Sequence, residues 1–136
     1  LSILNIENLN IIKNETDIPI AIDESIFKNN YKEFSENQLV DYAIIKPSLY
    51  GGVKSIIKLV DYFKKYNIEV VFSSSLNTKI GNIASIHLAS ALELSNHHGL
   101  NNCTFFKSDQ TQFPYGPNDS AMEINKLVGL GVCSNG

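Results

Sequence analysis

Three short apolar segments, each ending in polar or charged residues, dominate the pattern along the chain. They cover residues 18–24 (IPIAIDE), 42–47 (YAIIKP) and 68–75 (IEVVFSSS). Apolar runs of this length, rich in Ile and Val and bounded by Pro or by charge, are typical of strands buried on both faces. A weaker candidate for a fourth strand lies at residues 98–100. In each of the three main strands the polar residues gather at the carboxyl end.

Helical periodicity fills the intervals between these strands. One apolar stripe with helical spacing consists of Val53, Ile56, Ile57, Val60 and Phe63. A second consists of Ile80, Ile83, Ala84, His87, Leu88, Ala91 and Leu92. Asn67 follows the first stripe where a left-handed cap would stand, and less regular helices are expected at residues 6–14 and 33–40. The alternation predicts an α/β fold with parallel strands, and both a doubly wound sheet and a (β/α) barrel stay open.

Composition and charge narrow the class of protein. Hydrophobic residues make up 43% and charged residues 18% of the chain, which excludes a disordered chain. The net charge of -3 argues against a nucleic-acid partner. No apolar run is long enough for a membrane span, and no signal peptide is visible. Cys103 and Cys133 are expected to be thiols in the cytoplasm, although a disulfide between them stays open.

Two charged side chains stand at the carboxyl ends of predicted strands. Asp23, with Glu24 beside it, suits a hard cation such as Mg²⁺, or else begins the next helix as a cap. Lys46 emerges from a buried strand, and the resulting desolvation makes proton transfer or electrostatic stabilisation possible near neutral pH. The alternative for Lys46 is a side chain that reaches out to solvent.

Hydroxyl groups and glycines complete the candidate site. Ser73, Ser74 and Ser75 close the third strand, where they could bind a carboxylate or simply form a turn before the next helix. Gly51 and Gly52 permit close approach of the backbone to a ligand, or a tight turn. Acid, lysine and hydroxyls at the same end of successive parallel strands form an arrangement typical of an active site in either fold.

Four blocks of sequence resemble a known family. IPIAIDES, IIKPSLYGG, VVFSSSLNTKIG and HGL, between Ile18 and Leu100, look like the second half of the barrel of the o-succinylbenzoate synthase family, within the enolase superfamily. The resemblance implies that residues 1–102 form the C-terminal half of a (β/α)₈ barrel. It also implies that residues 103–136 return toward a capping domain. The N-terminal barrel half and that domain are absent here and would be needed, possibly as another chain.

The resemblance also implies roles for individual residues. Asp23 resembles the third Mg²⁺ ligand, with Glu24 supporting it, and Lys46 resembles the second of two opposed lysines. The serines at 73–75 and the glycines at 51–52 resemble loops that contact a small carboxylate substrate. The implied reaction is a magnesium-assisted dehydration through an enediolate, giving o-succinylbenzoate for menaquinone or phylloquinone synthesis.

Three alternatives remain open on the sequence. Racemases of N-acylamino acids and dipeptide epimerases in the same superfamily use the same residues for a different reaction. Asn77 is a departure from the pattern that the resemblance implies, because a glutamate often follows the serines at this position. A non-catalytic fragment or a subunit of a split barrel is also compatible with a chain that begins at Leu1 and lacks the other metal ligands. A flavodoxin-like domain would need a glycine-rich phosphate loop after the first strand, where none is found.

Overall fold

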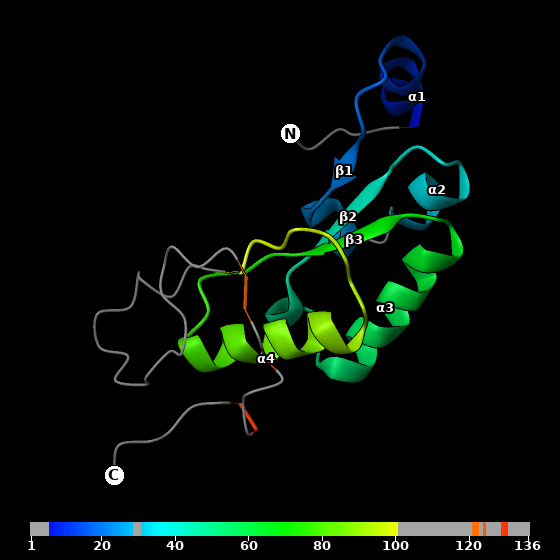
Figure 1. Ribbon diagram of the computed structural model, residues 1–136. Helices are drawn as coiled ribbons and strands as arrows, with labels where there is room; N and C mark the ends of the chain where they lie inside the picture. Colours follow the sequence, from blue (N-terminus) through cyan, green and yellow to red (C-terminus); the bar gives the residue numbers. More distant parts are fainter. Residues whose placement is uncertain (1–5, 29–30, 101–120, 123, 125–128, 131–136) are drawn as a thin grey trace. The chain divides into compact units, whose positions relative to one another are not determined.

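The computed structural model describes residues 6–28, 31–100, 121–122, 124 and 129–130. Its elements are α1 (Ile6–Glu15), β1 (Ala21–Ile22), the 3₁₀ helix η1 (Glu24–Lys28), α2 (Tyr31–Glu36), β2 (Tyr42–Ile45), the 3₁₀ helix η2 (Pro47–Leu49), α3 (Val53–Lys65), β3 (Glu69–Phe72) and α4 (Lys79–Ala91) (Figure 1). The cysteines and nearly all of the predicted segment 103–136 lie outside the described residues.

The chain divides into two compact units. The first consists of Leu1–Ile45 and Ile57–Val71, and the second of Lys46–Ile56 and Phe72–Gly136. The first unit therefore holds α1, β1, α2 and β2 with most of α3 and β3, and the second holds η2 and α4.

A parallel sheet organises the first unit. Its strand order is β1-β2-β3, and β1 pairs with β2 in parallel, with Ala21 opposite Tyr42 and Ile22 opposite Ala43. Helix α3 carries the chain from the end of β2 back to the start of β3, as Figure 1 shows. The predicted alternation of helices with parallel strands is confirmed.

The first strand is shorter than its apolar pattern predicts. Only Ala21 and Ile22 form β1, and Ile18 is 70% exposed. The Ile20 N–H donates to the Asp41 carboxylate at 2.8 Å instead of to a neighbouring strand. A side-chain acceptor therefore takes the Ile20 N–H, while the Ile20 carbonyl still accepts the Tyr42 N–H at 3.1 Å.

Burial alternates along each strand, so one face of the sheet is buried and the other is partly exposed. Ile22, Ala43, Ile45 and Val70 are buried, whereas Ile44 is only partly buried. Successive side chains of a strand point to opposite faces. The prediction that both faces are buried is therefore wrong for the described part of the chain.

The predicted apolar stripe of α3 is confirmed in part, because Ile56 is buried, Ile57 is partly buried and Val53, at the start of the helix, is 56% exposed. Val60 and Phe63 are fully buried, and the helix ends before Asn67, whose φ of 56° confirms the left-handed cap. Helix α2, in contrast, occupies residues 31–36 instead of 33–40. Gln38 has a φ of 55°, which is incompatible with a continuing helix, so the chain goes on from there as a loop.

Helix α4, in the second unit, buries a different face from the one that its apolar residues predict. Ile80 is 43% exposed, and Ala84 and Ala91 are exposed. The buried residues of α4 are Asn82, Ile83, Ser85, Ile86 and Ala89. Two polar residues lie on this face because their side chains form hydrogen bonds there, to Ser74 and to the Gly81 carbonyl.

The weak fourth strand is present as a single parallel bridge between Ser73 and Gly99. The Gly99 N–H donates to the Phe72 carbonyl at 2.9 Å, and the Ser74 N–H donates to the Gly99 carbonyl at 2.8 Å. A Cβ on Gly99 would stand 3.4 Å from the Ser73 hydroxyl, which is about van der Waals contact.

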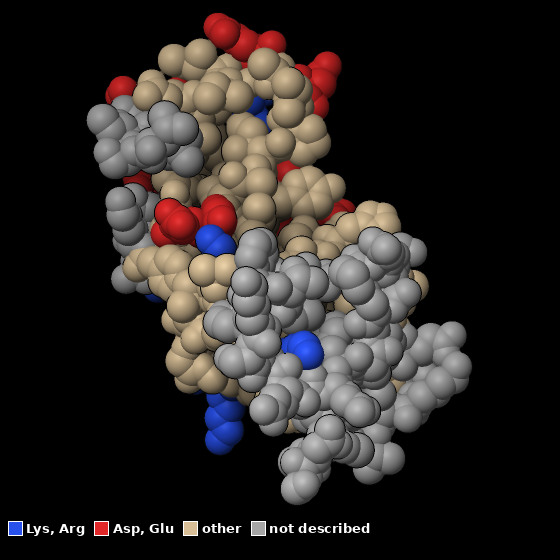
Figure 2. Space-filling model, turned by 90° about the vertical axis from the view of Figure 1, so that its left-hand side faces the viewer, with Lys and Arg blue, Asp and Glu red and all other residues tan. Residues whose placement is uncertain are grey.

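Acidic side chains gather at the end of the first unit that carries α1, on the face that Figure 2 presents, while lysines are scattered. Glu7, Glu15 and Asp17 are exposed around this helix. In the described part of the chain, no helix has the length and apolarity needed to cross a bilayer.

One ion pair fastens α1 to the sheet. Lys13 Nζ lies 2.5 and 2.6 Å from the two carboxylate oxygens of Asp41, which also accepts the Ile20 N–H. Burial alone would raise the pKa of Asp41, but the hydrogen bonds from Lys13 and Ile20 and the charge of Lys13 together lower it. The Asp41 carboxylate thus joins α1, the segment before β1 and the start of β2.

We expect Lys13→Met to lower the free energy of unfolding by about 0.5–1 kcal/mol, the upper range for partly exposed ion pairs. Because folding lowers the pKa of Asp41, its contribution is present above the ordinary carboxyl value of 3.8 and is lost as the pH falls through the lower folded value. Urea unfolding at pH 7 and pH 3 measures both effects.

Lys58→Met, at an exposed position of α3, is the control. Equal losses in the two variants would contradict the assigned role.

Candidate active site

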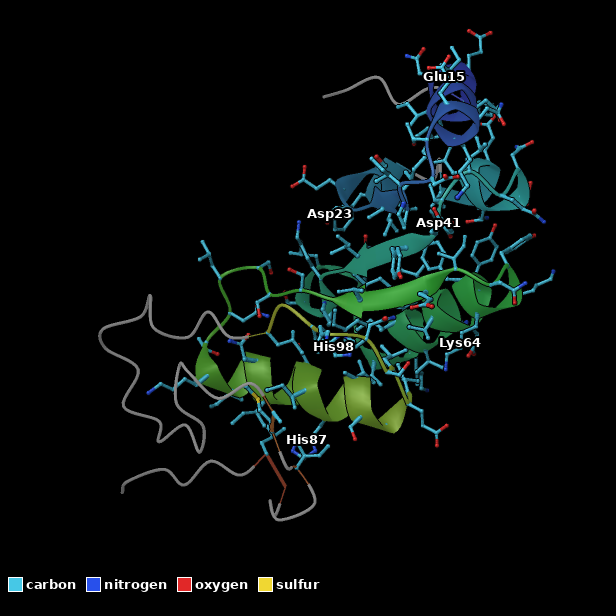
Figure 3. All side chains as sticks on the ribbon, turned by 45° about the horizontal axis from the view of Figure 1, so that its top comes forward. Glu15, Asp23, Asp41, Lys64, His87 and His98 are labelled. Carbon is cyan, nitrogen blue, oxygen red and sulfur yellow. The ribbon has the colours of Figure 1, made fainter. Side chains whose placement is uncertain are left out.

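Asp23 stands directly after β1, in the first unit. Its side chain is partly buried and Glu24, which begins η1, is exposed (Figure 3). The Asp23 carbonyl accepts the Ile26 N–H at 3.1 Å, so Asp23 also opens the first turn of η1. Both predictions for Asp23, a metal ligand and a helix-initiating residue, are compatible with this position.

Lys46 stands directly after β2 and opens the second unit. Its backbone is extended, with φ −101° and ψ 94°, and its side chain is partly buried. Pro47 follows, is buried, and begins η2 with its fixed φ. The sequence therefore projects the lysine from the carboxyl end of β2 and turns the chain immediately afterwards.

Gly51 and Gly52 form the turn between η2 and α3. Their φ values are 71° and 103°, in the region that favours glycine, and both residues are exposed. A Cβ on Gly52 would meet no atom within 4 Å. The turn confirms the conformational reason for the glycines, while a contact with substrate stays a prediction.

The loops after β2 and β3 meet through their hydroxyls. Ser48 Oγ and Ser75 Oγ lie 2.7 Å apart, within hydrogen-bond distance. Ser48 is two residues from Lys46, and Ser75 is the last of the predicted serines. The structure therefore brings the lysine loop and the serine segment together in the second unit, through a residue, Ser48, that the sequence analysis did not single out.

The three serines have different partners. Ser73 pairs with Gly99, Ser74 Oγ donates to Asn82 Oδ1 at 2.8 Å, and Ser75 Oγ donates to Asn77 Oδ1 at 3.3 Å. The pairing of Ser73 is a backbone bridge, whereas the hydroxyls of Ser74 and Ser75 bond to two different asparagine side chains. The sequence pattern did not reveal the contact with Asn82, because this residue lies off the apolar stripe predicted for its helix.

The His98 side chain lies beside the end of β3, where it accepts a backbone N–H that a neighbouring strand would otherwise bind (Figure 3). The Phe72 N–H donates to His98 Nδ1 at 3.1 Å, and His98 Nε2 lies 3.3 Å from the Leu94 carbonyl. Desolvation lowers the pKa of His98, the bond to Leu94 opposes this shift, and the charge of His97 adds to it. Nδ1 accepts, so the ring is neutral with its proton on Nε2.

The described residues do not by themselves form a metal site. No three of their His, Cys, Asp and Glu side chains lie close enough together to hold an ion. A single carboxylate such as Asp23 is chemically suited to Mg²⁺, which takes oxygen ligands and retains several waters.

The sequence model of the family described as enolase C-terminal domain-like matches residues 2–135. The chain belongs to this family. The expectation of a C-terminal portion of an enolase-superfamily barrel is thus confirmed, and the flavodoxin-like alternative is wrong.

Relatives in sequence carry two activities in their names. An o-succinylbenzoate synthase of Mycobacterium tuberculosis (strain H37Rv) is 31% identical over 119 residues, which are 86% of this chain and 35% of the relative. An L-Ala-D/L-Glu epimerase of Clostridium acetobutylicum is 28% identical over 88 residues, which are 64% of this chain and 25% of the relative. The chain thus spans about a third or less of these enolase-family relatives.

Solved structures agree with the fold. The L-Ala-D/L-Glu epimerase from Bacillus subtilis matches with a TM-score of 0.68 and 24% identity over 78% of this chain and 30% of that one. That likeness concerns the fold alone. An enolase from Pantoea ananatis with bound D-gluconate and Mg matches with a TM-score of 0.53 and 28% identity, over 62% of this chain and 21% of that one.

We expect nitrogen-detected NMR of the His98 ring to show the Nε2–H tautomer at pH 7 and a titration midpoint below the ordinary 6.5. His97→Gln removes a neighbouring charge and should raise that midpoint while leaving the tautomer unchanged. A proton on Nδ1 would show that the bond from Phe72 is not formed, and a midpoint at or above 6.5 would contradict the desolvation of the ring.

Proposed function

We propose that the complete enzyme containing this chain is an o-succinylbenzoate synthase-like lyase that dehydrates a small carboxylate substrate in menaquinone or phylloquinone synthesis in the cytoplasm. The observation that carries the proposal is the position of Lys46, at the carboxyl end of a parallel strand and next to a loop bonded to the serine segment. The 31% identity with o-succinylbenzoate synthases supports the choice of reaction.

Lys46 has the central role in the chemistry that we propose. Its ammonium group would lie over the substrate and stabilise negative charge that develops when a proton next to a carboxylate is removed. A second lysine, outside this chain, would remove that proton. The extended backbone and the following proline hold Lys46 at the end of β2, which favours one fixed position for its charge.

Asp23 would supply one of the magnesium ligands, with Glu24 supporting it from the next position. The bound ion would contribute electrostatic stabilisation of the substrate carboxylate. The other ligands would come from the N-terminal barrel half, in the same chain or another, since the described residues bring no three ligands together.

Gly51, Gly52 and the segment from Ser73 to Ser75 would contact the substrate. Both loops follow carboxyl ends of parallel strands, where barrel enzymes bind their ligands. When Ser48 donates to Ser75, the Ser75 proton is held only by a long bond of 3.3 Å to Asn77, so a substrate oxygen could compete for it. This favours a ligand with an acceptor group such as a carboxylate.

A dipeptide epimerase is the second candidate. The 28% identity with the epimerase of Clostridium acetobutylicum favours it, and proton exchange between opposed lysines would use Lys46 in an equivalent position. The two candidates differ in the fate of the carbanion, which loses hydroxide in one and regains a proton in the other.

In the complete enzyme, we expect Lys46→Met to reduce kcat by roughly 10³-fold or more, because a charge that acts in the transition state is lost. Affinity for Mg²⁺, measured by calorimetry, should stay within about twofold of wild type, because Lys46 is not one of the proposed metal ligands. Asp23→Asn should instead weaken Mg²⁺ binding. The control is Lys54→Met, at an exposed position in the first turn of α3. Near-normal turnover of Lys46→Met would refute the assigned role.

Assays of the complete enzyme with both substrates decide between the two reactions. We expect dehydration of the cyclohexadiene carboxylate to exceed epimerisation of L-Ala-L-Glu in kcat/KM by at least about 100-fold, equivalent to about 2.7 kcal/mol in transition-state binding. Comparable or reversed values would favour the epimerase, and no turnover of either would exclude both.

A further inference from the structure

Asn82 is an unusual buried polar residue in this structure. It is fully buried, and among the described residues the other buried polar side chains are Ser35 and Ser85. Both of these hydroxyls donate to carbonyls of their own helices, Ser35 to Tyr31 at 2.6 Å and Ser85 to Gly81 at 3.0 Å. The side chain of Asn82 instead bonds to a residue outside its helix.

That residue is Ser74, the middle of the three serines. Ser74 Oγ donates to Asn82 Oδ1 at 2.8 Å, and the Ser74 N–H donates to the Gly99 carbonyl at 2.8 Å. Two bonds of good length from one residue fix both its backbone and its side chain. Since a hydroxyl has a single proton, Ser74 has none left to donate to a ligand.

The anchored serine lies at the start of a tight turn. Leu76 has a φ of 41°, a left-handed conformation that is costly for a residue with a branched side chain, and α4 begins three residues later. Ser75, between the anchor and this turn, bonds to Ser48 at 2.7 Å. The anchor at Ser74 therefore restricts where the Ser75 hydroxyl can stand relative to the loop that follows Lys46.

We propose that Asn82 is a positioning residue, whose buried amide oxygen holds Ser74 and thereby presents Ser73 and Ser75 to a substrate carboxylate. This inference rests on the proposed function, because it assigns the serine segment to substrate binding. Ser74 acts through the loop, and Asn82 itself does not touch substrate.

The test compares steady-state kinetics of the complete enzyme with the cyclohexadiene carboxylate for wild type, Asn82→Ala, Asn82→Asp and Ser85→Ala. Asn82→Ala should raise KM on the order of 5- to 10-fold, the factor expected from loss of one hydrogen bond, with kcat changed far less. Asn82→Asp keeps an acceptor oxygen and should restore part of the affinity, at a cost in stability because a carboxyl is buried there. Ser85→Ala, at a buried position on the same helix, should leave KM unchanged.

A double-mutant cycle separates positioning from general destabilisation. If Asn82 acts through Ser74, the variant with both Asn82→Ala and Ser74→Ala should have a KM within about twofold of Ser74→Ala alone. Should Asn82→Ala fail to fold, Ser74→Ala breaks the same bond from the less buried side and should raise KM by a similar factor. Additive effects, or a KM for Asn82→Ala equal to that of Ser85→Ala, would overturn the proposal.

The wild-type enzyme distinguishes failure of this inference from failure of the proposed function. Normal turnover of the cyclohexadiene carboxylate with an unchanged KM in Asn82→Ala would refute only the positioning role. Absence of wild-type turnover with this substrate would refute the proposed function and, with it, the inference that depends on it.

Discussion

Parallel strands deliver their carboxyl ends to the same edge of a sheet, and the candidate site depends on this constraint. Lys46 follows β2, the serine segment follows β3, and the intervening helix α3 returns the chain so that both loops emerge at neighbouring positions. The 2.7 Å contact between Ser48 and Ser75 is the direct result. If β2 and β3 ran antiparallel, their carboxyl ends, and with them these residues, would lie at opposite edges of the sheet.

Polar side chains with partners in other segments hold the loops of the second unit. Asn82 bonds to Ser74 from within a buried helix face, and His98 accepts the Phe72 N–H where a strand neighbour would otherwise provide a carbonyl. An unsatisfied buried donor or acceptor is costly, so these bonds tolerate little displacement. The loops that carry the serines are thus held by hydrogen bonds as much as by apolar packing.

The candidate site residues are divided between the two units of the chain. Lys46 and the hydroxyls belong to the second unit, whereas Asp23, the candidate metal ligand, belongs to the first. The proposed lysine and carboxylate are thus carried by different units of the chain. The region matched in the synthase of Mycobacterium tuberculosis is 35% of that relative's length.

The sequence alone determined the alternation of helices and strands, the position of Lys46 at a strand end and the left-handed cap at Asn67, because each depends on neighbouring residues and on local backbone preferences. Tertiary structure decided the rest. The buried face of α4 includes Asn82, which accepts a hydrogen bond from Ser74, and apolar periodicity does not predict this contact. The short β1 likewise depends on Asp41, a side chain distant in sequence that captures the Ile20 N–H. Polar contacts between separate segments, such as these two, form only when the chain is folded.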